Sequence, residues 1–438
     1  MEVKENILEK SIELGKKAQK FIPAGCHTYS KGDDQFPDNA PKFILRGKGS
    51  NVWDVDGNKF IDWGMGLRSV ILGHSYQPVV DAVKQQLHYG SNFTRPSPIE
   101  VELAELMLNT VPGMDMVKFG KNGSDTTSAA IRLSRAYTKK DHVVMCKDTG
   151  FYSIGDWFIG KTECNSGVPK IVQDLSITFN YNDIDGLRKI FDENDDVSCV
   201  IMEPAVISEP KNYFLNKVKK MCHDKGAIFI FDETITGFRW SLNGAQNYFK
   251  VKPDLCTFGK AMGNGFSVSA LMGKRELMEL GGLEHKKERV FLLSLTHAGE
   301  THSLAAAIAT INEIREKKVV DHIWNIGSKF KDSVNKLSKE NGLEENISCI
   351  GYPCSPTIST KENNTISFPL RTLFLQETVS RGILIPYISI SYSHTEKELA
   401  NTLDAINDTF NICRKALDEG YDRYLKSKIV KPVFRRYN

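Results

Sequence analysis

The sequence lacks a long apolar run, cysteines at metal-ligand spacing and a large net charge, and each absence excludes a class of protein. Its nine cysteines include no Cys-x-x-Cys pair, so neither a zinc site nor a disulfide framework is predicted. Reduced thiols fit a cytoplasmic location best. The formal net charge of +3 over 438 residues is too small to indicate a nucleic acid or a membrane surface as a partner. No uninterrupted apolar run approaches the length that spans a bilayer.

What the sequence does contain is the composition of a large globular protein. Hydrophobic residues make up 41% and charged residues 25%, which is ordinary for a soluble chain. Charged and apolar residues alternate at helical spacing over the first 21 residues, which predicts an amphipathic helix rather than a signal peptide. This helix should end at Pro23–Gly25, because proline cannot continue it and glycine suits a left-handed cap.

Short apolar strands alternate with helices in the middle of the chain, up to about residue 275. This alternation predicts an α/β fold with a mostly parallel sheet. We expect an N-terminal helix and small-domain segment over 1–60, a large α/β domain over 61–315 and a smaller α+β domain over 316–438. The clearest expected elements are the strands VSCVIMEP, AIFIFDE and LCTFGK, the helix NYFLNKVKKMCHDKG, a helix over 97–111 with a capping box, and in the tail the strands TISF and GILIPYISIS.

Asp232 follows a run of apolar residues in AIFIFDETITGF. A carboxylate at the end of a buried strand stands where open α/β sheets bind their ligands. It leaves a dry environment and therefore needs a partner, for which a protonated ring nitrogen would serve. A structural alternative is equally compatible with this position, in which Asp232 caps a turn or pairs with an arginine.

Lys260 lies just beyond another apolar strand, in the glycine-rich turn of PDLCTFGKAMGNGF. A lysine at the rim of a cleft loses its proton more readily than a solvated lysine, which makes its amine usable for a Schiff base. A P-loop is excluded, because Asp254 stands where that motif needs its first glycine and Ala261 where it needs Ser or Thr. Taken alone, Lys260 could equally be structural.

A third turn, Gly123-Ser124, opens a predicted helix in VKFGKNGSDTTSAAIRLSRAY. The free N–H groups and the dipole of a helix N-terminus form a phosphate site. Simple N-capping by Ser124 or Asp125 explains the same residues, and the two roles do not exclude each other.

Together, in this order along the chain, these motifs resemble the class III aminotransferases of PLP fold type I, and most closely their glutamate-1-semialdehyde aminomutase branch. The resemblance runs from about Phe21 to the end of the chain. It implies the aspartate-aminotransferase-like α/β fold, with a large mostly parallel-sheet domain and a smaller α+β domain. The motifs that carry it are IFDETITGFR, PDLCTFGKAMGNG, ILGH, KNGSD, NSGVP and SHTEKEL.

The resemblance implies that pyridoxal 5′-phosphate is the cofactor and that Lys260 carries it as a Schiff base and moves the substrate's α-proton. It implies that Asp232 holds the pyridine nitrogen in its protonated state. Gly123 and Ser124 match the residues that bind the cofactor's phosphate. The cofactor would alternate between its PLP and PMP forms as a small-molecule amino donor and a carbonyl acceptor react in turn.

Three further positions match residues that surround the cofactor. Phe151 matches the aromatic residue that stacks on the ring, and Thr234 matches the residue that packs on its other face. Thr296, in LTHAGE, resembles the threonine that reaches the phosphate from the neighbouring subunit, which implies a homodimer with shared active sites.

The positions that match substrate contacts depart from the aminomutase pattern. Lys31 stands where that branch has an arginine, and lysine cannot offer a two-pronged fork to a carboxylate. Leu67, with Arg68 beside it, replaces a pocket tryptophan, and PYISISYS has no counterpart of the mutase glutamate. Tyr152, next to Phe151, is a further candidate substrate contact.

These departures favour an aminotransferase that acts on a small polar aldehyde or ketone, such as a keto-sugar of surface-polysaccharide synthesis. The alternative is glutamate-1-semialdehyde 2,1-aminomutase, which makes 5-aminolevulinate. A non-enzymatic binding module ranks third, since it would not need Lys260 and Asp232 together. The identities of the donor and the acceptor, and the pathway, do not follow from the sequence.

Overall fold

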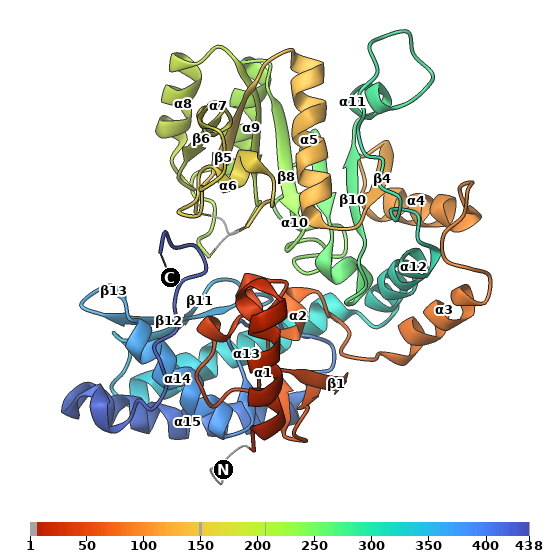
Figure 1. The fold of residues 1–438 in the computed structure, drawn as a ribbon. Helices are drawn as coiled ribbons and strands as arrows, with labels where there is room; N and C mark the ends of the chain where they lie inside the picture. Colours follow the sequence, from red (N-terminus) through yellow and green to blue (C-terminus); the bar gives the residue numbers. More distant parts are fainter. Residues whose placement is uncertain (1–6, 149–150, 206, 438) are drawn as a thin grey trace. The chain divides into compact units, whose positions relative to one another are not determined.

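The computed structural model describes residues 7–148, 151–205 and 207–437, and it divides into two compact units. Unit 1 combines residues 7–76 with Asp321–Arg435, and unit 2 consists of Gln77–Val320 with residues 436–437. Figure 1 shows both units and labels most of their helices and many of their strands. Each unit is described by itself below.

Unit 2 is built on a seven-stranded sheet. Its strands are β4 (Met116–Gly120), β5 (His142–Cys146), β6 (Ser176–Phe179), β7 (Val197–Met202), β8 (Ile228–Glu233), β9 (Leu255–Phe258) and β10 (Ser269–Gly273). They lie in the order β4-β10-β9-β8-β7-β5-β6. Only β10 runs antiparallel to its neighbours, and the pairs from β9 to β6 are all parallel. The prediction of a mostly parallel sheet is confirmed.

The three central strands of this sheet are buried along their whole length, as their continuous apolar sequences predict. The helices of unit 2 are α3 (Gln77–Leu87), α4 (Pro98–Thr110), α5 (Gly123–Thr138), α6 (Asp156–Ile159), α7 (Lys170–Asp174), α8 (Ile184–Glu193), α9 (Phe214–Asp224), α10 (Ala245–Tyr248), α11 (Arg275–Met278) and α12 (Thr301–Glu316). Helix α4 begins with the predicted capping box of Ser97 and Glu100. Helix α5 packs against β7, β9 and β10, and its buried face is formed by small and aliphatic residues.

Unit 1 contains two smaller sheets. The first has the order β1-β2-β3-β14 and the second the order β11-β12-β13. Their bounds are β1 (Ile44–Lys48), β2 (Asn51–Asp54), β3 (Lys59–Asp62), β14 (Ile383–Leu384), β11 (Ile347–Ile350), β12 (Thr357–Glu362) and β13 (Thr365–Ile366). The helices are α1 (Glu9–Phe21), α2 (Met65–Arg68), α13 (Val319–Glu340), α14 (Phe368–Ser380) and α15 (Glu396–Glu419).

The predicted domain boundary at residue 61 falls inside β3. This strand pairs with β2 on one side and, in parallel, with β14 on the other, so residues 61–76 fold with unit 1. The strand expected over 382–391 is also corrected, since only Ile383 and Leu384 form β14. Pro386 follows at once, and proline cannot donate a hydrogen bond to a sheet. The helices found in the described residues include none whose length and apolar character would let it cross a membrane.

Candidate active site

Asp232 lies near the carboxyl end of β8, in the middle of the large sheet, and is only 3% exposed. Its Oδ1 accepts hydrogen bonds from the Thr234 backbone N–H at 2.9 Å and from Thr257 Oγ1 at 2.8 Å. Burial raises the pKa of Asp232, while these hydrogen bonds and the positive charge of Lys260 act in the opposite direction. The result is a fixed carboxylate in a dry environment, which suits a cationic partner.

Lys260 begins a short turn that directly follows β9, the strand beside β8. Asp232 lies opposite Thr257 in the β8–β9 pairing, and Lys260 follows Thr257 by three residues, so both predicted residues belong to the same edge of the sheet. The backbone of Lys260 is left-handed, with a φ of 43°. Non-glycine residues in this conformation carry strain and cluster at functional sites.

Thr234 connects the three predicted motifs. A Cβ built on Gly123 would lie 2.9 Å from Thr234 Cγ2, and one built on Gly259 would lie 3.3 Å from the same atom. Thr234 therefore lies against both the first residue of α5 and the residue before Lys260. Its hydroxyl is buried and forms no hydrogen bond among the described residues, although it lies near enough to Asp232 to favour the charged carboxylate.

The N-terminus of α5 is held in place by a capping box. Asp125 accepts hydrogen bonds from the N–H groups of Lys121 and Asn122, at 3.0 and 2.8 Å. Ser269 on β10 donates to the Asn122 carbonyl at 2.9 Å, which anchors the turn to the sheet. Capping by Asp125, the structural alternative, is therefore present, and the N–H groups of Gly123 and Ser124 at the start of the helix suit an anion.

The segment around Phe151 rests on the same helix. Ser124 Oγ accepts a hydrogen bond from the Ile154 N–H at 3.1 Å, and Thr127 Oγ1 donates to the Tyr152 carbonyl at 3.0 Å. Phe151 is 45% exposed and packs edge-to-face against Phe158, so its ring offers a free face.

Tyr152 is 2% exposed, and its hydroxyl donates to the Cys146 carbonyl at 3.0 Å. This burial argues against the predicted substrate contact, and Tyr152 instead fixes the segment that carries Phe151. Thr296 is exposed, and its carbonyl accepts a hydrogen bond from Asn92 at 3.1 Å. An exposed side chain is compatible with the predicted reach into a second subunit.

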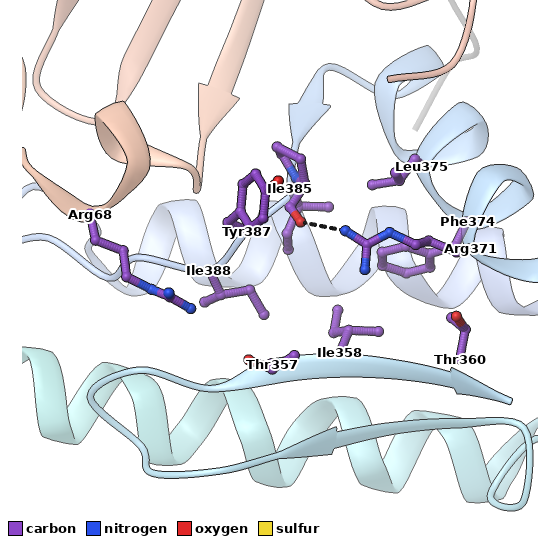
Figure 2. A pocket seen from close by; sticks show the side chains of 11 residues that line it. Arg68, Thr357, Ile358, Thr360, Arg371, Phe374, Leu375, Ile385, Tyr387 and Ile388 are labelled. Atoms are coloured by element: carbon purple, nitrogen blue, oxygen red, sulfur yellow. Dashed lines mark hydrogen bonds between the residues drawn. The ribbon is translucent and has the colours of Figure 1, made fainter. Parts of the chain in front are cut away.

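The other substrate candidates belong to unit 1. Lys31 ends a short exposed turn, and Leu67 and Arg68 form part of α2. All four residues of α2 have a positive φ, between 41° and 72°, and only one of them is glycine. Arg68 also lines a cavity of unit 1 (Figure 2).

Sequence reasoning missed Thr257 and Glu233. Thr257 lies directly across from Asp232 in the β8–β9 pairing, so a polar residue in the otherwise apolar LCTF was the available signal. Glu233 is fully buried and accepts hydrogen bonds from Thr236 Oγ1 and from the Ala245 and Gln246 N–H groups. These hydrogen bonds fix the conformation of the segment that follows Asp232.

Burial raises the pKa of Glu233 to about 7. Because the folded state binds this proton more tightly than the unfolded state, the protein gains stability from Glu233 at low pH and loses that gain as the pH rises to about 7. Glu233→Gln removes the titration. We expect the thermal midpoint of the variant, relative to wild type, to rise by about 5 °C between pH 5 and pH 8. The exposed Glu105, replaced in the same way, is the control, and an equal offset at both pH values would contradict the prediction.

Comparisons with known proteins show the family and the fold of this chain. Residues 34–412 match the family model described as aminotransferase class-III. The chain is 30% identical over 435 residues to a glutamate-1-semialdehyde 2,1-aminomutase of Sulfurihydrogenibium azorense, covering 93% of this chain and 100% of that one. It is 33% identical over 423 residues to a 3-aminobutyryl-CoA aminotransferase of Cloacimonas acidaminovorans, covering 94% and 99%. Among solved structures, the PLP internal aldimine form of the FumI protein from Sphingopyxis sp. MTA144 superposes with a TM-score of 0.86 at 24% identity, covering 93% and 97%.

Proposed function

The chain belongs to the class-III aminotransferases, and on that premise we propose that it transfers amino groups between small molecules with pyridoxal 5′-phosphate held by the residues around Lys260 and Asp232. The observation that carries the proposal is that Lys260 follows the strand beside β8, three residues after the Thr257 that lies opposite the buried Asp232 carboxylate. Family membership makes the chain an aminotransferase or a closely related aminomutase.

The residues of unit 2 fit this cofactor. Asp232 supplies the buried carboxylate that a protonated pyridine nitrogen requires, and Lys260 supplies the amine for the Schiff base. The N-terminus of α5, at Gly123 and Ser124, supplies donors for the phosphate. The buried hydroxyl of Thr234 has no hydrogen-bond partner among the described residues, so a bound ligand can supply one.

Two residues would enclose the ring, and one would complete the phosphate site. Phe151 offers an exposed aromatic face, and Thr234 lies on the side of the site formed by Gly123 and Gly259. In a homodimer, Thr296 of the partner subunit would contact the phosphate. The Thr296 side chain is exposed, so it can make such a contact.

The bound cofactor supplies an electron sink for the bond that breaks at the substrate's α-carbon. Lys260 Nζ takes the α-proton from that carbon and then gives a proton back to a neighbouring atom of the bound substrate and cofactor. One side chain therefore acts first as general base and then as general acid. Asp232 keeps the opposite end of the site negative throughout. Thr257 and the Thr234 N–H hold that carboxylate in one orientation, so its charge needs no rearrangement during the reaction.

The substrate is a small polar aldehyde or ketone together with an amino donor, and the enzyme works in a soluble, cytoplasmic setting. The aminomutase reaction is the second candidate, favoured by the 30% identity to the Sulfurihydrogenibium enzyme. Lys31 and Leu67, which replace an arginine and a tryptophan of that branch, favour the aminotransferase instead. A keto-sugar acceptor remains a prediction that the relatives' names do not support.

Spectroscopy tests the proposal. The purified protein should be yellow, and an amino donor should bleach it by converting the cofactor to its amine form. Candidate carbonyl compounds are then screened for return of the colour. A colourless protein that binds no pyridoxal phosphate would contradict the proposal.

Glutamate semialdehyde separates the two candidate reactions. Added to the amine form of the enzyme without any amino donor, it should leave 5-aminolevulinate absent if the chain is an aminotransferase. Continuous formation of 5-aminolevulinate under these conditions would establish the aminomutase reaction.

A further inference from the structure

The turn that precedes α5 carries an ion pair that has no part in the site as described so far. Lys121 Nζ donates hydrogen bonds to Glu300 Oε2 at 2.7 Å and to Ser303 Oγ at 3.0 Å. Lys121 stands two residues before Gly123, the first residue of α5, and Glu300 is the residue that directly precedes α12. The pair therefore joins the N-terminal ends of two helices of unit 2.

Both members of this pair are largely withdrawn from solvent. The side chain of Lys121 is 16% exposed and that of Glu300 is 21% exposed. The hydrogen bond from Lys121 is the main cause that holds the pKa of Glu300 below its ordinary value, against the opposite effect of burial. His297 Nδ1 lies 2.8 Å from the second carboxylate oxygen. Water and salt screen a partly buried pair less than one on an open surface, so this pair can hold two segments together.

The backbone of Lys121 is fixed as well. Its N–H donates to Asp125 Oδ2 at 3.0 Å, and its carbonyl accepts a hydrogen bond from Ser267 Oγ at 2.9 Å. The turn is therefore held from three directions, which are its own helix, the segment that leads into β10, and α12.

Helix α12 is a firm support for this turn. Thr301, its first residue, donates from its N–H to the Ser91 carbonyl at 2.9 Å and from Oγ1 to the Gly90 carbonyl at 2.7 Å. The helix packs against α3 and α4, and also against the short turn that begins at Lys260. The Lys121–Glu300 pair thus ties the start of α5 to a helix that also contacts the turn of Lys260.

We propose that Glu300 is a positioning residue for the cofactor's phosphate group. Through Lys121 it fixes the turn that leads to Gly123 and Ser124, whose N–H groups would receive that phosphate. The inference rests on the proposed function and adds to it a residue that need not touch the cofactor. Donors that are already held in place lose less conformational freedom when an anion binds, so a fixed turn binds the phosphate more tightly.

Charge alone predicts the opposite effect. Glu300 is an anion, and its removal would leave the positive charge of Lys121 unpaired, two residues before a site for a phosphate. On charge alone, Glu300→Met should therefore bind the phosphate more tightly than wild type. Loss of position should make the binding weaker. The sign of the change decides between the two, and methionine keeps the length of the side chain while it removes both oxygens.

Titration with two aldehydes tests the inference. Full-length protein stripped of its cofactor is titrated with pyridoxal 5′-phosphate and with pyridoxal, which has the same ring and aldehyde but no phosphate. The absorption of the Schiff base at Lys260 reports the binding of both. Glu300→Met should weaken binding of pyridoxal 5′-phosphate about three- to ten-fold and leave binding of pyridoxal unchanged.

Further variants separate the ion pair from its surroundings. Glu300→Gln keeps an oxygen that can accept from Lys121, so its affinity should lie between those of wild type and Glu300→Met. Lys121→Met should also bind the phosphorylated aldehyde more weakly. The double variant should bind it no more weakly than Lys121→Met does, because both residues act through one link. Glu316→Met, which removes an exposed carboxylate at the other end of α12, should bind both aldehydes as wild type does.

Phosphorus NMR of the loaded protein gives a second readout, because the resonance of the bound cofactor reports the surroundings of its phosphate. Glu300→Met should shift this resonance, and Glu316→Met should not. A change in the stability of the fold alone would leave the resonance where it is in wild type. An unmoved resonance in Glu300→Met would therefore overturn the inference.

The titration can also overturn it. Equal or tighter binding of pyridoxal 5′-phosphate by Glu300→Met would contradict a positioning role. A parallel loss of affinity for both aldehydes, with a lower thermal midpoint, would show that the pair only stabilises the fold. A wild type that binds neither aldehyde would contradict the proposed function itself. A wild type that binds the cofactor, with a Glu300→Met variant that binds it equally well, would remove only the role of Glu300.

Discussion

Lys260→Ala should remove nearly all amino transfer, with turnover falling about a hundred- to ten-thousand-fold. The variant keeps Asp232, the N-terminus of α5 and Phe151, so we expect it to retain the cofactor without a covalent bond. The only group lost is the amine whose charge acts on the Asp232 carboxylate. Turnover is measured with an amino donor that bleaches the wild type, and borohydride reduction followed by mass spectrometry measures covalent attachment.

Lys250→Ala is the matched control for this variant. Lys250 belongs to the same unit, is exposed, and has a left-handed backbone with a φ of 56°, close to the 43° of Lys260. The two substitutions therefore impose similar backbone strain and the same loss of charge. Near-normal turnover in Lys260→Ala, or borohydride fixation at another lysine, would show that the catalytic amine has been misassigned.

The sequence predicted the centre of unit 2 because the relevant signals are local. Continuous apolar runs identified β7, β8 and β9, and parallel neighbours bring their carboxyl ends to one edge of the sheet. Asp232 lies near the end of β8 and Lys260 just beyond the end of β9, so the structure places both at the edge where the sequence predicts that they meet.

The parts that sequence reasoning missed depend on contacts between distant segments. The domain boundary predicted at residue 61 differs from the structure because β3 pairs with β14, where Ile61 lies beside Ile383. Thr234 meets Gly123 and Gly259 only after the sheet and α5 have packed together, which no local pattern encodes.

Asp232→Asn should lower kcat/KM about a hundred- to a thousand-fold, the range seen when one preorganised electrostatic group is removed. Asparagine has the same shape, and its Oδ1 can still accept from the Thr234 N–H and Thr257 Oγ1. The variant therefore loses the negative charge and keeps the fold. Because burial disfavours that charge, Asp232→Asn should melt at or above the wild-type temperature, which separates a catalytic role from a structural one.

A cofactor analogue methylated at the ring nitrogen distinguishes charge from shape. If Asp232 acts by keeping that nitrogen positive, the analogue supplies a permanent positive charge and should restore part of the activity lost in Asp232→Asn. Thr257→Val removes one hydrogen bond to Asp232 Oδ1 and leaves the negative charge in place. This variant should therefore lose less activity than Asp232→Asn, and the methylated analogue should not restore the activity that it loses. Equal activity of Asp232→Asn and wild type with the natural cofactor would mean that the carboxylate does not face a protonated ring.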